Sequence, residues 1–281
     1  MNAERRSEAV LVTGCSSGIG RATAQHLASK GRTVYATARR LDSIRDLESA
    51  GCRLLELDVT DEESMATAVT AVEDAEGAVG VLVNNAGYSQ SGAVESVTME
   101  AVRRQFDTNV FGLVRMCQLV LPRMRAQRWG RIVNISSMGG RLVFPGGGFY
   151  HGTKFAVEAI SDALRYEVKG FGIDVVIVEP GLIITDFGST AAGSLGDSGD
   201  GPYAHFNNAV GSTTAGAYEG GMSRFGAGPE AVAKAIERSI RRPRPRVTVT
   251  ASAKIMLGLR RVMTDRMWDR TMRTNYPQPR P

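Results

Sequence analysis

The chain has 281 residues, of which 43% are hydrophobic and 22% are charged, and its formal net charge is +5. This balance is that of a globular protein with enough apolar side chains for a core, and it argues against extensive disorder. Residues 1–8 are polar, and the apolar runs are far shorter than the roughly 20 residues needed to span a bilayer. We therefore expect a soluble, cytoplasmic protein.

The charge is unevenly distributed along the chain. From residue 238 to the end, 12 Lys and Arg residues stand against only Asp265 and Asp269, a net of +10, whereas the rest of the chain carries −5. A basic tail can bind nucleic acid or anionic lipid, but solvated helix faces and contacts with protein are commoner. The tail lacks interleaved aromatic residues and any recognised nucleic-acid-binding module, so we expect no nucleic-acid partner.

Cysteines and histidines are few and scattered. Metal sites and dithiol motifs need closely spaced ligands. The three cysteines (Cys15, Cys52 and Cys117) and the three histidines lie far apart in the chain. The sequence therefore predicts reduced thiols and no metal site.

Short apolar runs rich in Val, Ile and Leu alternate with amphipathic segments of helical length. The predicted strands are residues 9–13, 33–37, 53–57, 79–83, 131–135, 174–178 and 246–250. The predicted helices include residues 19–30, 41–49, 62–76 and 99–121. Strands that are apolar on both faces and separated by helices indicate a parallel sheet with helices on both faces. We therefore predict a single doubly wound α/β domain of the Rossmann type, with a seven-stranded, mostly parallel sheet and ligand sites beyond the carboxyl ends of its strands.

Residues 187–228 break this alternation, because they are rich in Gly, Ala and Ser. An irregular stretch of that length inside a compact domain is usually a lid or a binding loop, so we expect a substrate-binding loop here. Gly228-Pro229 then opens a predicted helix over residues 230–240. Residues 238–281 form a basic C-terminal extension of the same domain.

Apolar residues recur at helical spacing within this extension. They are Ile255, Met256, Leu259, Val262 and Met263. This stripe could dock on its own domain, on a second subunit or on a membrane, and a membrane role requires the stripe to be exposed in the free protein. Because exposed patches of that size are uncommon in soluble monomers, we expect the stripe to pack against protein. Arg260, Arg261 and Arg266 should then remain in solvent.

A glycine-rich turn follows the first predicted strand and opens a helix. Its residues are Thr13, Gly14, Cys15, Ser16, Ser17, Gly18, Ile19 and Gly20. Glycines allow a tight turn and a close approach of the backbone to a ligand, and the free N–H groups at the helix start favour a pyrophosphate. The spacing is G-x-x-x-G-x-G rather than the usual G-x-G-x-x-G. Such turns also occur for packing alone, but the position after the first strand favours a cofactor site.

The end of the second predicted strand indicates which cofactor would bind. An NAD site needs an acidic residue about 20 positions after the turn, to bind the ribose 2′-hydroxyl. Here the sequence continues Ala38-Arg39-Arg40, and no acid occurs before Asp42. A carboxylate would repel a 2′-phosphate, whereas a guanidinium can bind it. Arg39, together with Ser16 or Arg40, therefore predicts NADP(H) rather than NAD(H); a solvated arginine pair is the alternative.

Further motifs follow in a fixed order. They are Asp58-Val59, Asn84-Asn85-Ala86-Gly87, Asn109, Ser137, Tyr150-x-x-x-Lys154 and Pro180-Gly181. Together with the glycine turn, their order and spacing over residues 9–185 resemble the short-chain dehydrogenase/reductase family. The turn and residues 35–40 are most similar to its 17β-hydroxysteroid dehydrogenase and retinol dehydrogenase-like branch. The resemblance implies an alcohol dehydrogenase or carbonyl reductase that uses NADP(H) and forms a homodimer or homotetramer.

Tyr150 and Lys154 also make chemical sense without the family. They stand four residues apart, on one face of a predicted helix. A free tyrosine has a pKa of ~10 and is a poor base at neutral pH. A nearby ammonium favours the phenolate, so we expect Lys154 to lower the pKa of Tyr150. The phenol can then give a proton to a carbonyl oxygen or remove one from an alcohol.

The resemblance implies roles for the other motif residues. Ser137 would hold the substrate oxygen, Asn109 would hold a water that links Lys154 to solvent, and Lys154 would also bind the nicotinamide ribose. The remaining cofactor contacts would be made by Asp58 and Val59 at the adenine, by Asn85, Ala86 and Gly87 along the ribose, and by Pro180, Gly181, Ile183 and Thr185 near the nicotinamide. A helix cap is the structural alternative for Asp58.

The substrate is indicated only by composition. Apolar side chains near the expected site suggest a steroid-, retinoid- or lipid-like molecule, with a small polar substrate such as a sugar or polyol as the alternative. They are Val143, Phe144, Phe149, Leu182 and Phe187. A non-catalytic protein that senses NADP(H) is a hypothesis of another class. The complete Ser137, Tyr150 and Lys154 set argues against it, because a sensor has no use for a proton donor.

Overall fold

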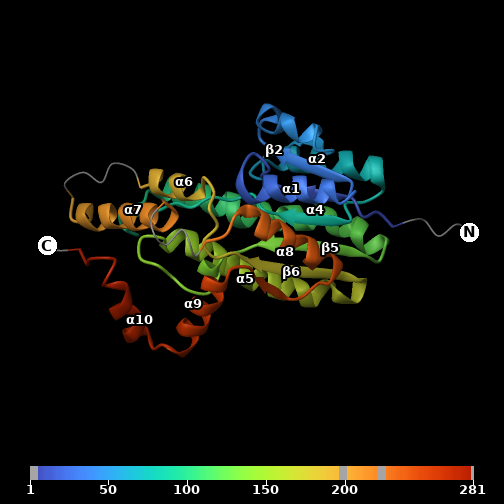
Figure 1. The fold of residues 1–281 in the computed structure, drawn as a ribbon. Coiled ribbons are helices and arrows are strands. Elements are labelled where there is room, and N and C mark those ends of the chain that lie inside the picture. The colour runs from blue at the N-terminus through green and yellow to red at the C-terminus, as the bar shows by residue number, and fades with distance from the viewer. Residues whose placement is uncertain (1–5, 196–200, 220–225, 280–281) are drawn as a thin grey trace, which may run out of the picture.

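A seven-stranded sheet forms the centre of the computed structural model, which describes residues 6–195, 201–219 and 226–279 (Figure 1). The strand order is β3-β2-β1-β4-β5-β6-β7, and every neighbouring pair is parallel. The strands are β1 (Val10–Val12), β2 (Val34–Ala38), β3 (Arg53–Glu56), β4 (Val81–Asn84), β5 (Gly130–Ile135), β6 (Ile173–Glu179) and β7 (Arg246–Thr248). The doubly wound fold predicted from the sequence is confirmed, and the strand ends differ from the predicted ones by at most two residues.

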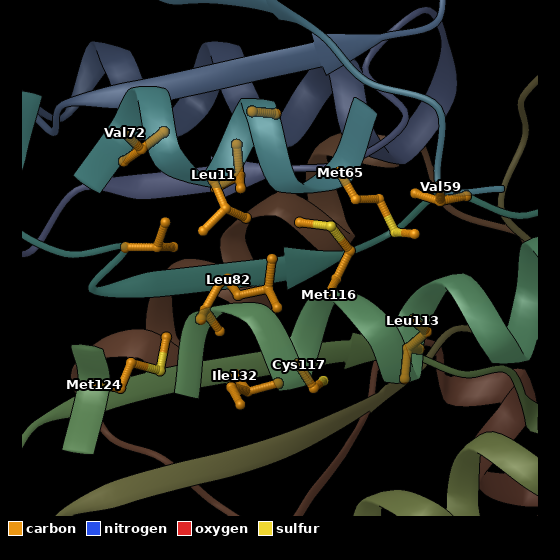
Figure 2. Packing of buried hydrophobic residues seen from close by; sticks show 14 of the residues in the cluster. Leu11, Val59, Met65, Val72, Leu82, Leu113, Met116, Cys117, Met124 and Ile132 are labelled. Carbon is orange, nitrogen blue, oxygen red and sulfur yellow. The ribbon is translucent and has the colours of Figure 1, made fainter. Parts of the chain in front are cut away.

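Helices cover both faces of the sheet. One face carries α2 (Glu62–Glu76), α4 (Gly112–Ala126) and α5 (Gly148–Val168), and the other carries α1 (Gly18–Ser29), the 3₁₀ helix η1 (Leu41–Glu48) and α8 (Pro229–Arg241). Successive strand residues point to opposite faces, so Leu11 packs with the first layer while Val10 and Val12 pack with the second. Figure 2 shows the first of these two cores, where side chains of α2 and α4 meet those of β1, β4 and β5.

The strand order changes direction between β1 and β4. The chain moves outward from β1 to β3 and then returns to place β4 on the other side of β1. The connections after these two strands leave in opposite directions, and ligands of doubly wound folds bind at such a point. The glycine-rich turn and the Asn85-Ala86-Gly87 segment follow β1 and β4 directly, so the sheet brings both motifs together at the carboxyl ends of these strands.

The predicted helix over residues 99–121 is interrupted. The structure has α3 (Met99–Phe106), a π-helical turn (Asp107–Phe111) and then α4. Asn109 lies within the π-helical turn, where the backbone departs from regular α-helical bonding. Such turns are frequent at functional sites.

The described parts of region 187–228 include the helices α6 (Phe187–Gly193) and α7 (Ala204–Glu219), where the sequence suggested an irregular loop. Alanine is the best helix former, and small side chains let neighbouring segments approach closely. A Cβ on Gly211 of α7, for example, would lie 3.0 Å from the Leu195 side chain. The many Gly, Ala and Ser residues of this region are therefore compatible with closely packed helices. The substrate-binding role of the region stays a prediction.

The C-terminal extension folds into β7, α9 (Ala251–Val262) and α10 (Asp265–Met272). The predicted apolar stripe divides into two parts. Met256 and Met263 pack with Trp268 in a small cluster that also holds Leu142 and Phe144. The other members of the stripe are exposed, with accessible fractions of 62% for Ile255, 49% for Leu259 and 77% for Val262. The prediction that the stripe packs against protein is therefore confirmed within this chain for Met256 and Met263 but not for the other three residues.

The three arginines of this extension that were expected in solvent differ in their surroundings. Arg261 and Arg266 are exposed, as expected. Arg260 is not simply in solvent, because it pairs with the carboxylate of Asp265 at 2.6 Å and lies over the Trp268 ring. The turn between α9 and α10 brings these side chains together. No helix in the described ranges is long and apolar enough to cross a bilayer.

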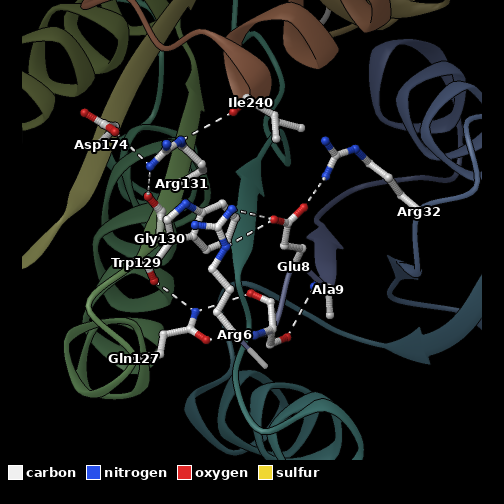
Figure 3. A network of polar contacts seen from close by, with 11 residues as sticks. Arg6, Glu8, Ala9, Arg32, Gln127, Trp129, Gly130, Arg131, Asp174 and Ile240 are labelled. Atoms are coloured by element: carbon white, nitrogen blue, oxygen red, sulfur yellow. Dashed lines mark hydrogen bonds and ion pairs between the residues drawn. The ribbon is translucent and has the colours of Figure 1, made fainter. Parts of the chain in front are cut away.

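Polar contacts gather at the opposite, amino end of the sheet (Figure 3). Arg131 pairs with Asp174 at 2.8 Å and reaches the carbonyl oxygen of Ile240, while Glu8 contacts Arg6 and Arg32. Arg131 thus joins β5 to β6 and to the end of α8, and Glu8 joins the start of the chain to Arg32, just before β2. The predicted site residues lie at the other, carboxyl end of the sheet.

Candidate active site

The glycine-rich turn leads directly into the start of α1. Gly14 and Gly18 have φ angles of +72° and +55°, which favour glycine. A Cβ on Gly20 would lie 2.3 Å from the carbonyl oxygen of Gly14, so α1 packs directly on the turn. Ser17 precedes α1 but forms no side-chain capping bond, and the first turn holds no acidic residue. The first N–H groups of this helix are therefore suited to a phosphate.

Two arginines lie beside this turn. The amide of Cys15 donates to the carbonyl of Thr37 at 2.7 Å, which fastens the turn to the end of β2. Arg39 and Arg40 follow β2 and are exposed, as is Ser16. Among residues 6–195, 201–219 and 226–279, neither arginine has an ion-pair partner. Asp42, the first acid after β2, pairs instead with Arg45 at 2.5 Å.

Asp58 shapes a turn rather than capping a helix. Its Oδ1 accepts bonds from the amide and the hydroxyl of Thr60, at 2.9 and 2.7 Å. The cap of α2 is Asp61, which accepts from the Ser64 amide, so the capping alternative for Asp58 is wrong. Val59 is 8% exposed and packs against α4, where a Cβ on Gly112 would meet its backbone.

The segment after β4 connects the glycine turn to the predicted catalytic residues. The side-chain amide of Asn85 donates to the carbonyls of Thr13 and Gly14 at 2.9 and 3.0 Å, and the Ala86 amide donates to the Thr13 hydroxyl. A Cβ on Gly87 would lie 3.0 Å from Asn109 Oδ1 and 3.8 Å from Lys154 Nζ. The structure thus brings Gly87 against two of the predicted catalytic residues.

Asn109 is almost fully buried and its side chain bonds to two other segments. Its Oδ1 accepts from the Tyr88 amide at 3.1 Å, while its Nδ2 donates to the Tyr88 carbonyl at 2.9 Å and to the Thr153 hydroxyl at 3.1 Å. The side chain therefore fixes the loop after β4 to α5. The bound water implied by the family resemblance stays a prediction.

Ser137, Tyr150 and Lys154 meet at the carboxyl end of β5. Ser137 follows β5, accepts a bond from the Gly139 amide at 3.0 Å and hydrogen-bonds the phenol of Tyr150. Lys154 donates from Nζ to the carbonyl of Ile135 at 2.8 Å, and Nζ lies 5.8 Å from the centre of the Tyr150 ring. Ser137 follows β5, whereas Tyr150 and Lys154 lie on α5. Along the chain, Ser137 precedes Tyr150 by 13 residues.

The ionisation of Tyr150 differs from the expectation. Burial raises the pKa of Tyr150 to about 12, and the hydrogen bond from Ser137 opposes this only in part. Burial also lowers the pKa of Lys154 to about 8, although the charge of Glu158 acts in the other direction. The lowered pKa predicted for Tyr150 is therefore wrong for the protein by itself, because burial outweighs the effect of an ammonium 5.8 Å away.

The last cofactor motif lies against the glycine turn. A Cβ on Gly18 would lie 3.5 Å from the Thr185 side chain, and the Pro180 carbonyl accepts from the Met138 amide at 2.8 Å. Ile183 pairs with Ala227 in an isolated bridge. Gly181 allows a close approach of Thr250, since a Cβ at this position would overlap the threonine hydroxyl. Residues 180–185 therefore border both the turn and the catalytic residues.

Helices α6 and α7 cover this end of the sheet. The Phe187 ring at the start of α6 lies 5.5 Å from the Tyr150 ring. Ser194 accepts bonds from Gln90 and Ser91, and Asn207 accepts from the Ala93 amide at 3.0 Å. The pair is thus fastened to the loop after β4.

The apolar residues proposed for the substrate pocket do not all gather at Tyr150. Phe144 packs on Trp268, with ring centres 6.2 Å apart, and Val143 lies beside α9 and α10. Both belong to the contact with the C-terminal extension, because the loop after β5 turns outward before α5. Phe187 does lie beside Tyr150, with ring centres 5.5 Å apart.

His151 is a site residue that the sequence did not reveal. Its Nε2 accepts from the Phe144 amide at 3.2 Å, so its Nδ1 carries the hydrogen and donates to the Gly139 carbonyl at 3.0 Å. These bonds brace the turn after Ser137 against α5. Burial lowers the pKa of His151 to about 4. Its position next to Tyr150 was the only signal, and a lone histidine is not diagnostic.

The lowered pKa of His151 predicts a loss of stability in acid. Between pH 6.5 and 4 the unfolded chain binds a proton that the folded protein rejects, so the free energy of unfolding falls as the pH falls. The loss from this group should approach about 3 kcal/mol below pH 4. Urea unfolding of His151→Gln should lack this part of the pH dependence, whereas the same change at the exposed His205 should keep it. Identical pH profiles for wild type and His151→Gln would contradict the assignment.

Known proteins share this arrangement. A family model described as short chain dehydrogenase matches residues 8–193. The 3-ketodihydrosphingosine reductase of Bacteroides thetaiotaomicron is 46% identical over 179 residues, which cover 63% of this chain and 65% of that protein. The match therefore spans less than two thirds of this relative's length.

Two solved structures extend the comparison over most of the chain. A short-chain dehydrogenase from Streptomyces avermitilis is 35% identical, with a TM-score of 0.79 and coverage of 96% of this chain and 99% of that one. The closed form of a serine dehydrogenase complexed with NADP+ is 26% identical, with a TM-score of 0.73 and coverage of 85% and 93%. With the fold, the glycine turn and the Ser137, Tyr150 and Lys154 set in place, this chain belongs to the short-chain dehydrogenase/reductase family.

Proposed function

We propose that the protein transfers hydride between NADP(H) and the hydroxyl or carbonyl group of an apolar small molecule. The observation that carries this proposal is the meeting of Ser137, Tyr150 and Lys154 beside a helix start suited to phosphate. The exposed Arg39 and Arg40 support NADP(H) over NAD(H), and the serine dehydrogenase described above was solved with NADP+. We place the protein in the cytoplasm as a homodimer or homotetramer.

The chain's own residues would manage the proton and the substrate oxygen. Bound NADPH supplies the hydride. Tyr150, neutral at pH 7 because its pKa is about 12, donates its proton to the carbonyl oxygen, and Ser137 donates a hydrogen bond to the same oxygen. Lys154 donates one hydrogen bond from Nζ to the Ile135 carbonyl, so its ammonium keeps two further N–H donors for the ribose hydroxyls. In the reverse direction Tyr150 must first lose its proton, so alcohol oxidation should become faster as the pH rises.

Apolar surface at the mouth of the site supports an apolar substrate. Phe187 contacts the Tyr150 ring, and the side chains of Val94 and Ile184 are 66% and 40% exposed. A relative is named as a 3-ketodihydrosphingosine reductase, which fits reduction of a carbonyl compound. A sugar or polyol substrate stays the alternative.

A substrate panel tests the proposal. Hydroxysteroids, retinoids and long-chain ketones should turn over with kcat/KM values at least tenfold above those of sugars and polyols, measured by NADPH absorbance. A preference for sugars or polyols would overturn the apolar assignment. NADPH binding without turnover of any compound would favour the non-catalytic sensor.

Cofactor choice should depend mainly on Arg39. A charge-assisted contact to the 2′-phosphate is worth ~1.5–3 kcal/mol, so Arg39→Ala should weaken NADPH binding by roughly 10- to 150-fold and leave NADH binding unchanged. Fluorescence titration of both cofactors measures this. Arg45→Ala is the control, because Arg45 is an exposed arginine of η1 that already pairs with Asp42. Equal affinities of the wild type for NADPH and NADH would refute the NADP(H) assignment.

A further inference from the structure

The outer face of α9 is an exposed apolar surface. Ile255, Leu259 and Val262 lie within one arc of the helix, and Ala251 and Gly258 complete that arc. The opposite face is the one that packs on the protein, through Ala253 and the methionines of the Trp268 cluster. Figure 1 shows α9 and α10 extending away from the sheet. A membrane role requires these apolar side chains to be exposed in the free protein, and Ile255, Leu259 and Val262 are exposed.

Unpaired cations border this stripe on one side. Lys254 and Arg261 are exposed, and neither has an ion-pair partner in the parts of the chain that the structure describes. α9 contains no acidic residue at all. Asp265, which pairs with Arg260 at 2.6 Å, belongs to α10. The helix therefore presents an apolar arc with a purely cationic edge.

Beyond the cationic edge lies a groove between α9, α10 and the loop after β5. Its charged lining consists of Arg141, Arg260 and Arg261, and its apolar lining includes Phe155 and Trp268. Trp268 fastens α10 to this loop by donating to the Val143 carbonyl at 3.1 Å. A surface that offers guanidinium groups next to apolar side chains suits a molecule with an anionic head and an apolar body.

A lipid surface fits this face better than a second copy of the chain. A stable protein interface buries roughly 800 Å² on each partner, whereas the stripe comprises three side chains over about two helical turns. An antiparallel two-fold pairing through the stripe would also place Lys254 of each copy on the same side as Arg261 of the other. Basic helices with one apolar arc and a cationic edge lie in the interface of anionic membranes.

We propose that α9 docks the protein on an anionic lipid surface, with Ile255, Leu259 and Val262 below the headgroups and Lys254 and Arg261 at the level of the phosphates. The inference does not depend on the proposed reaction, because it concerns a surface outside the catalytic residues. It replaces the expectation from the sequence that the whole stripe packs against protein.

Vesicle sedimentation of the full chain tests this docking. The wild type should sediment with phosphatidylcholine vesicles that contain phosphatidylserine, bind weakly to phosphatidylcholine alone and dissociate in high salt. The variant I255Q/L259Q/V262Q should lose at least tenfold in affinity. K254Q/R261Q should lose roughly 30-fold, from the attraction of two cations to the anionic surface.

A matched charge control is available in the same tail. R242Q/R244Q removes two exposed cations between α8 and β7, at the amino end of the sheet, and should bind vesicles like the wild type. All variants change exposed side chains, so their melting temperatures and turnover in solution should match the wild type. Absence of wild-type binding to the anionic vesicles, or full binding by I255Q/L259Q/V262Q, would overturn the proposal. A smaller oligomer of that variant in light scattering would overturn it as well, by showing that the stripe covers a second copy.

Discussion

Tyr150→Phe is expected to lose nearly all turnover, by about 10²- to 10⁴-fold in kcat, while NADPH still binds. The change removes the phenolic oxygen that accepts a hydrogen bond from Ser137 and keeps the ring that contacts Phe187 and His151. Packing is therefore preserved and the proton donor alone is lost. Steady-state assays with NADPH and the best ketone of the panel, together with a fluorescence titration of NADPH, measure the two effects separately.

The same helix offers a matched control for Tyr150. Tyr166 also lies on α5 but is 86% exposed, so Tyr166→Phe should turn over substrate like the wild type. If Tyr150→Phe kept more than about a tenth of the wild-type kcat, the barrier would have changed by less than about 1.4 kcal/mol and the acid–base assignment would be wrong. Loss of NADPH binding would instead indicate a role in holding the cofactor.

Arg246→Met should destabilise the protein by about 3 kcal/mol, because the buried Glu158 loses its guanidinium partner and the buried Glu179, which also pairs with Arg141, loses one of two. Arg246 on β7 bonds Glu158 through Nε at 2.9 Å, lies 3.5 Å from Glu179 and pairs with Asp162. Glu158 and Glu179 are 6% and 0% exposed. Glu158 also stands four residues after Lys154 on α5, so this cluster ties the catalytic helix to β6 and β7.

Urea unfolding across pH checks this prediction. Burial raises the pKa of Glu158, so its carboxyl should be protonated at low pH and the effect of Arg246→Met should shrink there. The double variant Arg246→Met/Glu158→Gln should recover part of the lost stability, since one buried charge is removed. Arg241→Met is the control, because its side chain is 70% exposed in a loose pair with Glu237. A destabilisation by Arg246→Met below about 1 kcal/mol would mean that neighbouring groups already compensate these carboxylates.

The local sequence determined the architecture and most of the site. Apolar runs of strand length, separated by amphipathic segments, predicted all seven strands, because the spacing of side chains along one segment depends on that segment alone. Glycines at fixed spacing predicted the turn after β1, and the resemblance to the short-chain dehydrogenase/reductase family implied that Ser137 lies beside Tyr150 and Lys154. Parallel strands end at one edge of the sheet, so motifs after several strands converge without further information.

Burial and long-range packing were decided only by the tertiary structure. The raised pKa of Tyr150 results from the segments that enclose it, and no spacing along α5 encodes how much water they exclude. His151 can brace the loop after β5 only because the fold places the Gly139 carbonyl and the Phe144 amide of that loop beside its ring. The apolar stripe of α9 was visible in the sequence, but which of its residues are covered depends on where Trp268 and the loop after β5 lie. A pattern along one helix determines the face that it offers, and only the surrounding fold determines what covers that face.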